Sequence, residues 1–305
     1  MAERSVFVSK AEYPFFEEIR VSHDWFGGFA LSQKRKCQIS LHQNFMEHYP
    51  EHKVLEISGA SLMSLGAKLS AMNLSKRTIN CCASVESAFQ SSRIYSDGTS
   101  VVGPFPEYLF LPGKTCKKLV KEASNGMHSH TYLFDGMIFY APSHHISQFY
   151  DFLYLNALLE PENQIVAEKL RAEGYISVTD LATKSLNCQA RAAAIYVGLV
   201  KAGKIGEVRN KESYLKLFYT DEKGQPTGLE AYDSVQLLDK GRVRLLSPVV
   251  PRTVDRVAVE QYYTEHCCLL TNRKLEENYL DLQNPQHSNN PERIHPFTDY
   301  EEIRA

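Results

Sequence analysis

Three polar residues stand at helical spacing in the first half of the chain. Glu86, Gln90 and Arg93 follow Ser84, which is a good N-cap residue for a helix. Positions i, i+4 and i+7 of a helix share one face. A carboxylate and an amide that project together from such a face can hold a sugar diol and the edge of a base. The same pattern also fits a solvated face with an internal side-chain pair, and the spacing leaves both interpretations open.

Asp151 and Asn156 interrupt a strongly apolar stretch, residues 147–159. A helix that is apolar on almost every side belongs in the middle of a core. Asn156 would share a face with Phe149 and Phe152, while Asp151 lies on another side. Buried Asp and Asn side chains need hydrogen-bond partners, so these two either lock the fold or line a site.

Three cations, Lys34, Arg35 and Lys36, stand close to the start of an expected helix, shortly after Gly27 and Gly28. Positive charge at a helix N-terminus opposes the helix dipole, at a small cost. A bound phosphate would offset that cost. The alternative is a solvated basic turn.

The histidines suggest a metal site at first sight, since His128 and His130 have a spacing that can ligate zinc on a strand and His144 and His145 are adjacent. No cysteine or carboxylate stands at a characteristic distance from them, so we expect no metal. The sequence also contains no GxxxxGK[ST], GxGxxG, GxSxG or HExxH motif. Kinase, classical dehydrogenase, serine hydrolase and zincin activities therefore have no support from motifs.

The elements that must position these residues are predicted to be mostly helical. Periodicity and turn signals predict helices over residues 32–48, 61–69, 84–90, 147–159, 162–173 and 187–202. We expect an extended segment over residues 1–20, a surface loop or insertion over 96–113, and a hairpin within 131–140 around Asp135-Gly136. The fold class that follows is mainly α, α+β with only small β elements.

The pattern of expected secondary structure changes near residue 218. Short strand-like pieces then run to Val250, and one or two helices follow before a linker-like stretch. We therefore predict a compact helical domain over residues 1–217. A smaller α/β appendage of unknown role, which could bind a partner, is predicted over 218–305.

Composition limits the function further. The chain has 305 residues, of which 43% are hydrophobic and 23% charged, values that exclude a disordered, collagen-like or coiled-coil protein. The 34 basic residues are balanced by 36 acidic ones, for a net charge of −2. This balance argues against a protein that coats nucleic acid by bulk attraction. Any recognition of nucleic acid should centre on a local pocket.

A membrane protein is not expected, because the N-terminus has no apolar signal core and no apolar run approaches the roughly 20 residues that span a bilayer. The seven cysteines are an odd number with no CxxC spacing, which argues against a disulfide framework. We therefore expect a reduced, cytoplasmic protein.

Five segments, in order along the chain, carry a family resemblance. They read Phe-Ala-Leu-Ser-Gln-Lys-Arg-Lys (29–36), Lys-Leu-Ser-Ala-Met-Asn-Leu (68–74), Ser-Val-Glu-Ser-Ala-Phe-Gln (84–90), Phe-Tyr-Asp-Phe-Leu-Tyr-Leu-Asn-Ala-Leu (149–158) and Ser-Leu-Asn-Cys-Gln-Ala-Arg (185–191). Together they resemble the NADAR (NAD- and ADP-ribose-associated) family, most closely the NADAR antitoxins paired with DarT-type DNA ADP-ribosyltransferases. The resemblance covers roughly residues 1–217. One departure is Ser87, where more typical members carry a histidine.

The resemblance implies a compact, mostly helical N-glycosidase that removes ADP-ribose from the amino group of guanine in nucleic acid. No cofactor is implied. Glu86 would stabilise the ribose as positive charge builds at C1′. Lys34 would act as a nucleophile or proton-transfer group, with assistance from Asp151. The positions expected to bind ADP-ribose are Arg35, Lys36, Asn73, Gln90, Arg93 and Asn156.

The expected partners are ADP-ribosylated nucleic acid and an ADP-ribosyltransferase toxin. Two other functions remain open from the sequence. One is a non-catalytic module that binds ADP-ribosylated DNA or blocks a toxin by contact. The other is hydrolysis of a small N-ribosylated metabolite.

Overall fold

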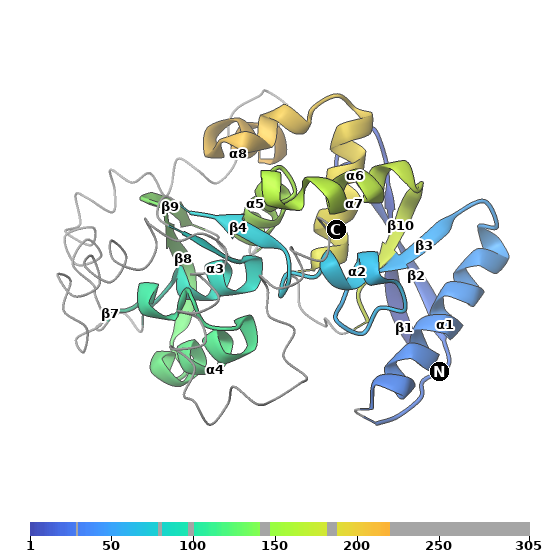
Figure 1. The fold of residues 1–305 in the computed structure, drawn as a ribbon, viewed down its shortest axis with the longest axis horizontal. Coiled ribbons are helices and arrows are strands. Elements are labelled where there is room, and N and C mark those ends of the chain that lie inside the picture. The colour runs from blue at the N-terminus through green and yellow to red at the C-terminus, as the bar shows by residue number, and fades with distance from the viewer. Residues whose placement is uncertain (29, 79–80, 97–100, 141–146, 182–187, 220–305) are drawn as a thin grey trace. The chain divides into compact units, whose positions relative to one another are not determined.

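The computed structural model describes residues 1–219, apart from residues 29, 79–80, 97–100, 141–146 and 182–187 (Figure 1). The predicted appendage over 218–305 and the pair His144-His145 therefore lie almost wholly outside the described residues. Two compact units divide the described chain. The first combines residues 1–74 with 150–219, and the second consists of 75–149.

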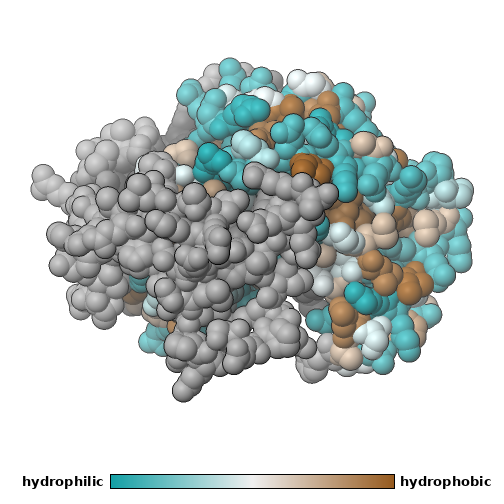
Figure 2. Space-filling model, in the orientation of Figure 1, coloured by the Kyte–Doolittle hydropathy of each residue, from teal (hydrophilic) through white to brown (hydrophobic). Residues whose placement is uncertain are grey.

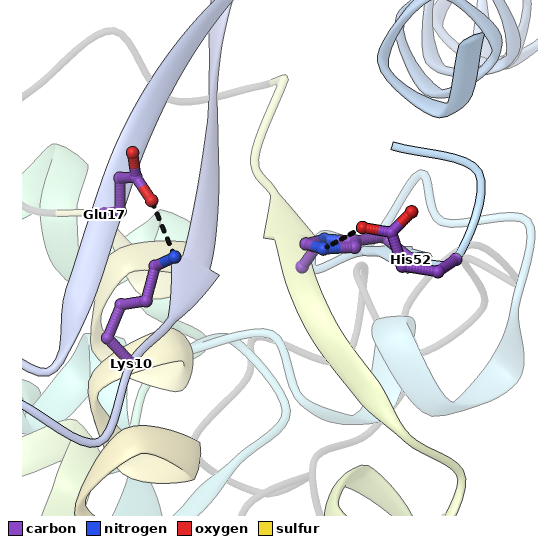
Figure 3. A network of polar contacts seen from close by, with 5 residues as sticks. Lys10, Glu17 and His52 are labelled. Atoms are coloured by element: carbon purple, nitrogen blue, oxygen red, sulfur yellow. Dashed lines mark hydrogen bonds and ion pairs between the residues drawn. The ribbon is translucent and has the colours of Figure 1, made fainter. Parts of the chain in front are cut away.

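A four-stranded mixed sheet forms the centre of the first unit (Figure 1). Its strands, in sheet order, are β2 (Phe16–His23), β1 (Ala2–Ser9), β10 (Tyr175–Thr179) and β3 (Lys53–Glu56). β1 pairs antiparallel with both β2 and β10, whereas β3 runs parallel to β10. Figure 3 shows two polar contacts beside this sheet. Lys10 Nζ lies 2.8 Å from Glu17 Oε2 across the β1–β2 hairpin, and Nε2 of His52, just before β3, lies 3.2 Å from Glu51 Oε1. The His52 ring is hydrogen-bonded to Ser177 of β10 through Nδ1.

Helices cover this sheet on both faces. Val6 and Val8 of β1 pack against Leu41 and Phe45 of α1 (Leu31–His48). Phe7 must point to the opposite face, since side chains alternate along a strand, and it is buried too. α7 (Gln189–Lys201) contacts β1 and β10.

The other helices of the first unit are short. They are α2 (Ser64–Lys68), the part of α5 (Gln148–Ala157) from Tyr150 on, α6 (Gln164–Ala172), α8 (Lys211–Phe218) and the 3-10 segments η3 (Pro161–Asn163) and η4 (Ile205–Arg209). α5 is buried along nearly its whole length, as its apolar sequence predicts. The hydroxyl of Tyr154 donates to the carbonyl oxygen of Leu69 at 2.7 Å, which ties α5 to the end of α2.

Gly198 of α7 lies against the turn between β1 and β2, and this contact yields a stability prediction. A Cβ at Gly198 would overlap with the carbonyl oxygens of Phe15 and Lys10. Both atoms belong to the backbone and cannot rotate away, so Gly198→Ala should lower the free energy of unfolding by about 1–3 kcal/mol or more. Urea denaturation measures the change. Gly206→Ala is the matched control, because no atom of the described residues other than its chain neighbours lies within 4 Å of its Cβ position. Equal losses in both variants would contradict the packing argument.

The second unit is built on another four-stranded sheet. In sheet order its strands are β7 (Val101–Val102), β6 (Arg93–Ser96), β8 (His128–Phe134) and β9 (Met137–Tyr140). A two-stranded sheet and the helical segments complete it: β4 (Ser75–Arg77), β5 (Cys82–Ser84), α3 (Val85–Ser91), η1 (Pro106–Tyr108) and α4 (Gly113–Ser124). Tyr95 of β6 and Phe105 pack with Cys116 and Val120 of α4 to form a core.

The prediction of a mainly α fold is wrong. Four-stranded sheets are present in both units, so the described chain is an α+β protein. The missed strands explain the error: β3 has four residues and β10 has five, and they pair across more than a hundred residues of chain. Such short runs carry little periodic signal, and their stability comes from partners that are distant in the sequence.

Most of the predicted helices are confirmed. α1, α3, α5, α6 and α7 lie where the periodicity placed them, while the segment 61–69 contains only the five-residue α2. The hairpin between β8 and β9 is confirmed as well, with Asp135 and Gly136 at positive φ in its turn. The expected loop over 96–113 contains β7 and η1.

The visible described surface in Figure 2 is mostly hydrophilic, with scattered hydrophobic side chains. The most exposed large ones near α1 and α2 are Trp25, Leu31, Ile39, Leu62 and Met63. Over the described ranges, no helix combines the length and the apolar character that crossing a membrane requires.

Candidate functional site

Glu86 and Gln90 project from α3 and interact with each other. The side-chain oxygen of Ser84 accepts from the Ser87 amide at 3.0 Å, so α3 begins with the predicted N-cap. Gln90 Nε2 then donates to Glu86 Oε1 at 2.9 Å. Both side chains are buried, Glu86 with 8% and Gln90 with 4% of its surface exposed. The internal pair is therefore present, but its face is buried rather than solvated.

Arg93 extends this pair into a three-residue series. Its Nη1 lies 3.5 Å from Gln90 Oε1, at the long limit of a hydrogen bond. The guanidinium carbon lies 5.6 Å from the centre of the Phe89 ring and 5.0 Å from that of Tyr95, within range for cation–π attraction. Gln90 thus stands between an anionic and a cationic group.

The two carboxyl oxygens of Glu86 differ in their contacts. Among the described residues, the one hydrogen bond to Glu86 reaches Oε1, and Oε2 accepts none. A buried carboxylate held at one oxygen can stabilise positive charge that develops nearby, because the surroundings screen it weakly. This is the property required of a group that faces an oxocarbenium-like sugar.

Asp151 lies in the first unit, where it forms an ion pair with Arg191 of α7. Arg191 Nη2 donates to Asp151 Oδ2 at 2.7 Å, and the two side chains are 19% and 7% exposed. Burial raises the pKa of Asp151 to about 6, while the Arg191 guanidinium opposes the shift. Oδ1 of Asp151 has no hydrogen-bond partner within the described part of the chain.

The two candidate asparagines bind backbone oxygens. Asn156 Nδ2 donates to the carbonyl oxygens of Phe152 at 3.0 Å and Val208 at 2.6 Å, which joins α5 to η4. Asn73 Nδ2 donates to the Ala67 carbonyl oxygen at 3.0 Å and closes the turn after α2. These contacts hold the fold locally, and ligand binding by either amide stays a prediction.

The three cations lie in the first turns of α1. The N-cap residue, Ala30, supplies no side-chain hydrogen bond. Lys34 and Lys36 are exposed, Arg35 is partly buried, and Lys36 Nζ lies 5.8 Å from the centre of the Phe26 ring. The structure thus gathers Glu86, Gln90 and Arg93 in the second unit. It holds Asp151 and the cations in the first.

Arg191 and Gln189 form polar contacts in the first unit but were not among the residues predicted from the sequence. Gln189 Oε1 accepts from the Ala71 amide at 2.7 Å, and its Nε2 donates to the Ile57 carbonyl oxygen at 2.7 Å. A signal for Arg191 was present: it is a cation near the start of an apolar, Ala-rich helix, and Asp151 is an anion on another apolar helix. Buried charges of opposite sign are generally paired.

No group of three or more His, Cys, Asp or Glu side chains suited to a metal ion occurs among the described residues. The five described cysteines form no disulfide with one another.

The sequence was also compared with models of known protein families. The family model for DarT1-associated NADAR antitoxins matches residues 2–227. The chain belongs to this family. A search of curated proteins returned no match.

Within this NADAR antitoxin, the Ser87 side chain stabilises the local fold. Its hydroxyl donates to the Leu111 carbonyl oxygen at 2.7 Å and lies 2.8 Å from the Ser84 hydroxyl, so it ties α3 to the segment before α4. The Cys116 thiol approaches the Ser87 carbonyl oxygen at 3.8 Å. Burial raises the pKa of Cys116 far above its usual range, with a further contribution from Glu86, so this thiol stays protonated. Neither side chain is available as a reactive group beside Glu86.

Proposed function

We propose that this NADAR antitoxin is an N-glycosidase that removes ADP-ribose from guanine bases of nucleic acid in the cytoplasm and so reverses the action of a DarT1-type ADP-ribosyltransferase. The observation that carries the proposal is the buried Glu86 carboxylate, held by Gln90 at one oxygen, in a chain of this family. We further propose residues 1–217 as the hydrolase domain and 218–305 as an appendage.

The reaction breaks the bond between C1′ of the ribose and the exocyclic nitrogen of guanine. Positive charge develops at C1′ as the bond lengthens, and the Glu86 carboxylate stabilises it. The leaving amine takes up a proton, and water adds its hydroxyl to C1′ and releases the proton. A carboxyl with a pKa of about 6, such as that of Asp151, can both donate and accept a proton near neutral pH.

A direct assay tests this function. The full-length protein is incubated with guanine-ADP-ribosylated DNA, and free ADP-ribose and unmodified DNA are measured. Release of both in equal amounts is the expected result. Binding of the modified DNA without any release would refute hydrolysis and support a binding module. Cleavage only of small N-ribosylated compounds would refute nucleic acid as the substrate.

Lys34 provides a separate prediction, because a nucleophilic lysine and a phosphate-binding cation respond differently to replacement by arginine. Lysines that form imines with sugars are usually desolvated, whereas Lys34 is exposed. Its exposure favours a role for its charge in holding the pyrophosphate. Lys34→Arg should then keep the release rate within a few-fold, while Lys34→Ala weakens binding of ADP-ribosylated DNA. A rate in Lys34→Arg as low as in Lys34→Ala would instead indicate a nucleophilic lysine.

A further inference from the structure

A buried carboxyl group, a hydroxyl and an imidazole form a hydrogen-bonded series in the first unit. Glu56 ends β3 and Thr179 ends the parallel strand β10, so both lie at the carboxyl edge of this strand pair. Thr179 Oγ1 donates to Glu56 Oε2 at 2.6 Å. Nε2 of His42, from α1, lies 2.9 Å from the same hydroxyl. None of the three residues belongs to the proposed hydrolase site.

Both oxygens of the Glu56 carboxyl group accept hydrogen bonds. Glu56 is only 1% exposed, and its Oε1 accepts from the Ser58 hydroxyl at 2.8 Å and from the Leu181 amide at 3.1 Å. The same amide also lies 3.3 Å from Oε2. Asp180, the next residue after Thr179, is the acidic neighbour whose charge acts on it. The groups that contact Glu56 therefore come from the chain after β3, from the end of β10 and from the chain after it. His42 of α1 is linked to Glu56 through the Thr179 hydroxyl.

The pKa values of Glu56 and His42 are shifted in opposite directions. Burial raises the pKa of Glu56 to about 7, and the charge of Asp180 adds to the shift, while the hydrogen bonds of Thr179, Ser58 and Leu181 oppose it. Burial lowers the pKa of His42 to about 4. Near neutral pH the imidazole is therefore uncharged, and Glu56 is the group that titrates.

Titration of Glu56 must reverse the direction of the hydrogen bonds. When Glu56 is ionised, Thr179 donates to it, so Thr179 accepts from His42 and the imidazole proton is on Nε2. When Glu56 is protonated at Oε2, its O–H donates to Thr179, and the Thr179 hydroxyl donates to Nε2 of His42. The imidazole proton is then on Nδ1.

We propose that His42, Thr179 and Glu56 form a proton relay, a second acid–base site in which a proton taken up at Nδ1 of His42 is stored on Glu56. The proton bound at Nδ1 stays there, the Nε2 proton of His42 moves to Thr179, and the Thr179 hydroxyl proton moves to Glu56. One proton enters, three N–H or O–H bonds form and two break. The imidazole is uncharged before and after, and the carboxylate is neutralised.

Amide substitution at Glu56 gives a sharp test of this relay. The Leu181 amide can only donate, and it lies closer to Oε1 of Glu56, at 3.1 Å, than to Oε2, at 3.3 Å. It therefore favours a glutamine at position 56 with its oxygen at the Oε1 position and its NH2 group toward Thr179. Thr179 then accepts from the amide and donates to Nε2 of His42. Glu56→Gln should therefore hold the imidazole proton on Nδ1 at every pH.

The readout is the nitrogen-15 NMR spectrum of the His42 ring in the full-length protein from pH 5.5 to 8.5, assigned by comparison with His42→Gln. In the unmodified protein the proton should move from Nδ1 to Nε2 with a midpoint near pH 7, at the midpoint of the carbon-13 shift of the Glu56 carboxyl. In Glu56→Gln the Nδ1–H form should persist without a midpoint. Two different midpoints, or the Nε2–H form in Glu56→Gln, would overturn the relay.

Position 179 provides the matched pair of controls. Thr179→Ser keeps the hydroxyl and should keep the common midpoint of His42 and Glu56. Thr179→Val replaces the hydroxyl with a methyl group and should leave the His42 tautomer independent of pH while Glu56 still titrates. Coupling that survives in Thr179→Val would show that the proton does not pass through this hydroxyl.

Discussion

Replacing Glu86 with glutamine is expected to slow the release of ADP-ribose by about 100- to 1,000-fold, the usual effect of removing one group that stabilises charge in a transition state. The amide has nearly the same shape as the carboxylate, and its oxygen can still accept from Gln90 Nε2. The variant therefore loses the negative charge next to C1′ and keeps the local contacts. Single-turnover release from guanine-ADP-ribosylated DNA measures this step without interference from product dissociation.

The control for Glu86→Gln is Gln90→Met, which removes the hydrogen bond to Glu86 but leaves the carboxylate in place. One hydrogen bond contributes about 1 kcal/mol, so this variant should lose less than about tenfold in rate. Binding of the modified DNA should change little in Glu86→Gln, because the charge acts mainly when the bond breaks. A release rate within threefold of the unmodified protein in Glu86→Gln would remove Glu86 from the mechanism.

Replacing Arg191 with methionine is expected to lower the free energy of unfolding by about 3–5 kcal/mol, the usual cost of removing one partner from a buried ion pair. Arg191 is the cation that lies 2.7 Å from Asp151, and without it the Asp151 carboxylate would be charged and unpaired in the core. Denaturant unfolding at pH 8 measures the loss. The double variant Asp151→Asn, Arg191→Met should recover much of it, because it leaves no buried charge.

The Arg191→Met effect should depend on pH, with a sign set by the raised pKa of Asp151. In the unmodified protein the folded state binds a proton at Asp151 between pH 3.8 and about 6, where the unfolded chain does not. The contribution of Asp151 to stability is therefore present at low pH and lost as the pH rises through this range. Removing the guanidinium raises the folded pKa further, so Arg191→Met should be less destabilised at pH 5 than at pH 8. Equal losses at both values would contradict the ion-pair explanation.

The candidate site was predictable to different degrees from its sequence. Glu86 and Gln90 are four residues apart on a helix whose N-cap is also local, so sequence spacing was sufficient to place them together. Their burial was not predictable, because it depends on the sheet and on α4 of the second unit. Asp151 was predicted to need a partner, but its identity required the packing of α5 against α7, which are 40 residues apart at the contact.

By itself, the sequence determined the local features of this protein: the Ser84 N-cap of α3, the Asp135-Gly136 turn, the apolar α5 and the family to which the chain belongs. These depend on residues close together in the chain or on motifs read in order. Tertiary structure alone decided the pairing of strands that are distant in the sequence, the Asp151–Arg191 pair and the contact of Glu56 with Thr179, which are 123 residues apart. Strand pairing and buried charges are stabilised by distant partners, and a one-dimensional pattern carries no information on which segments meet.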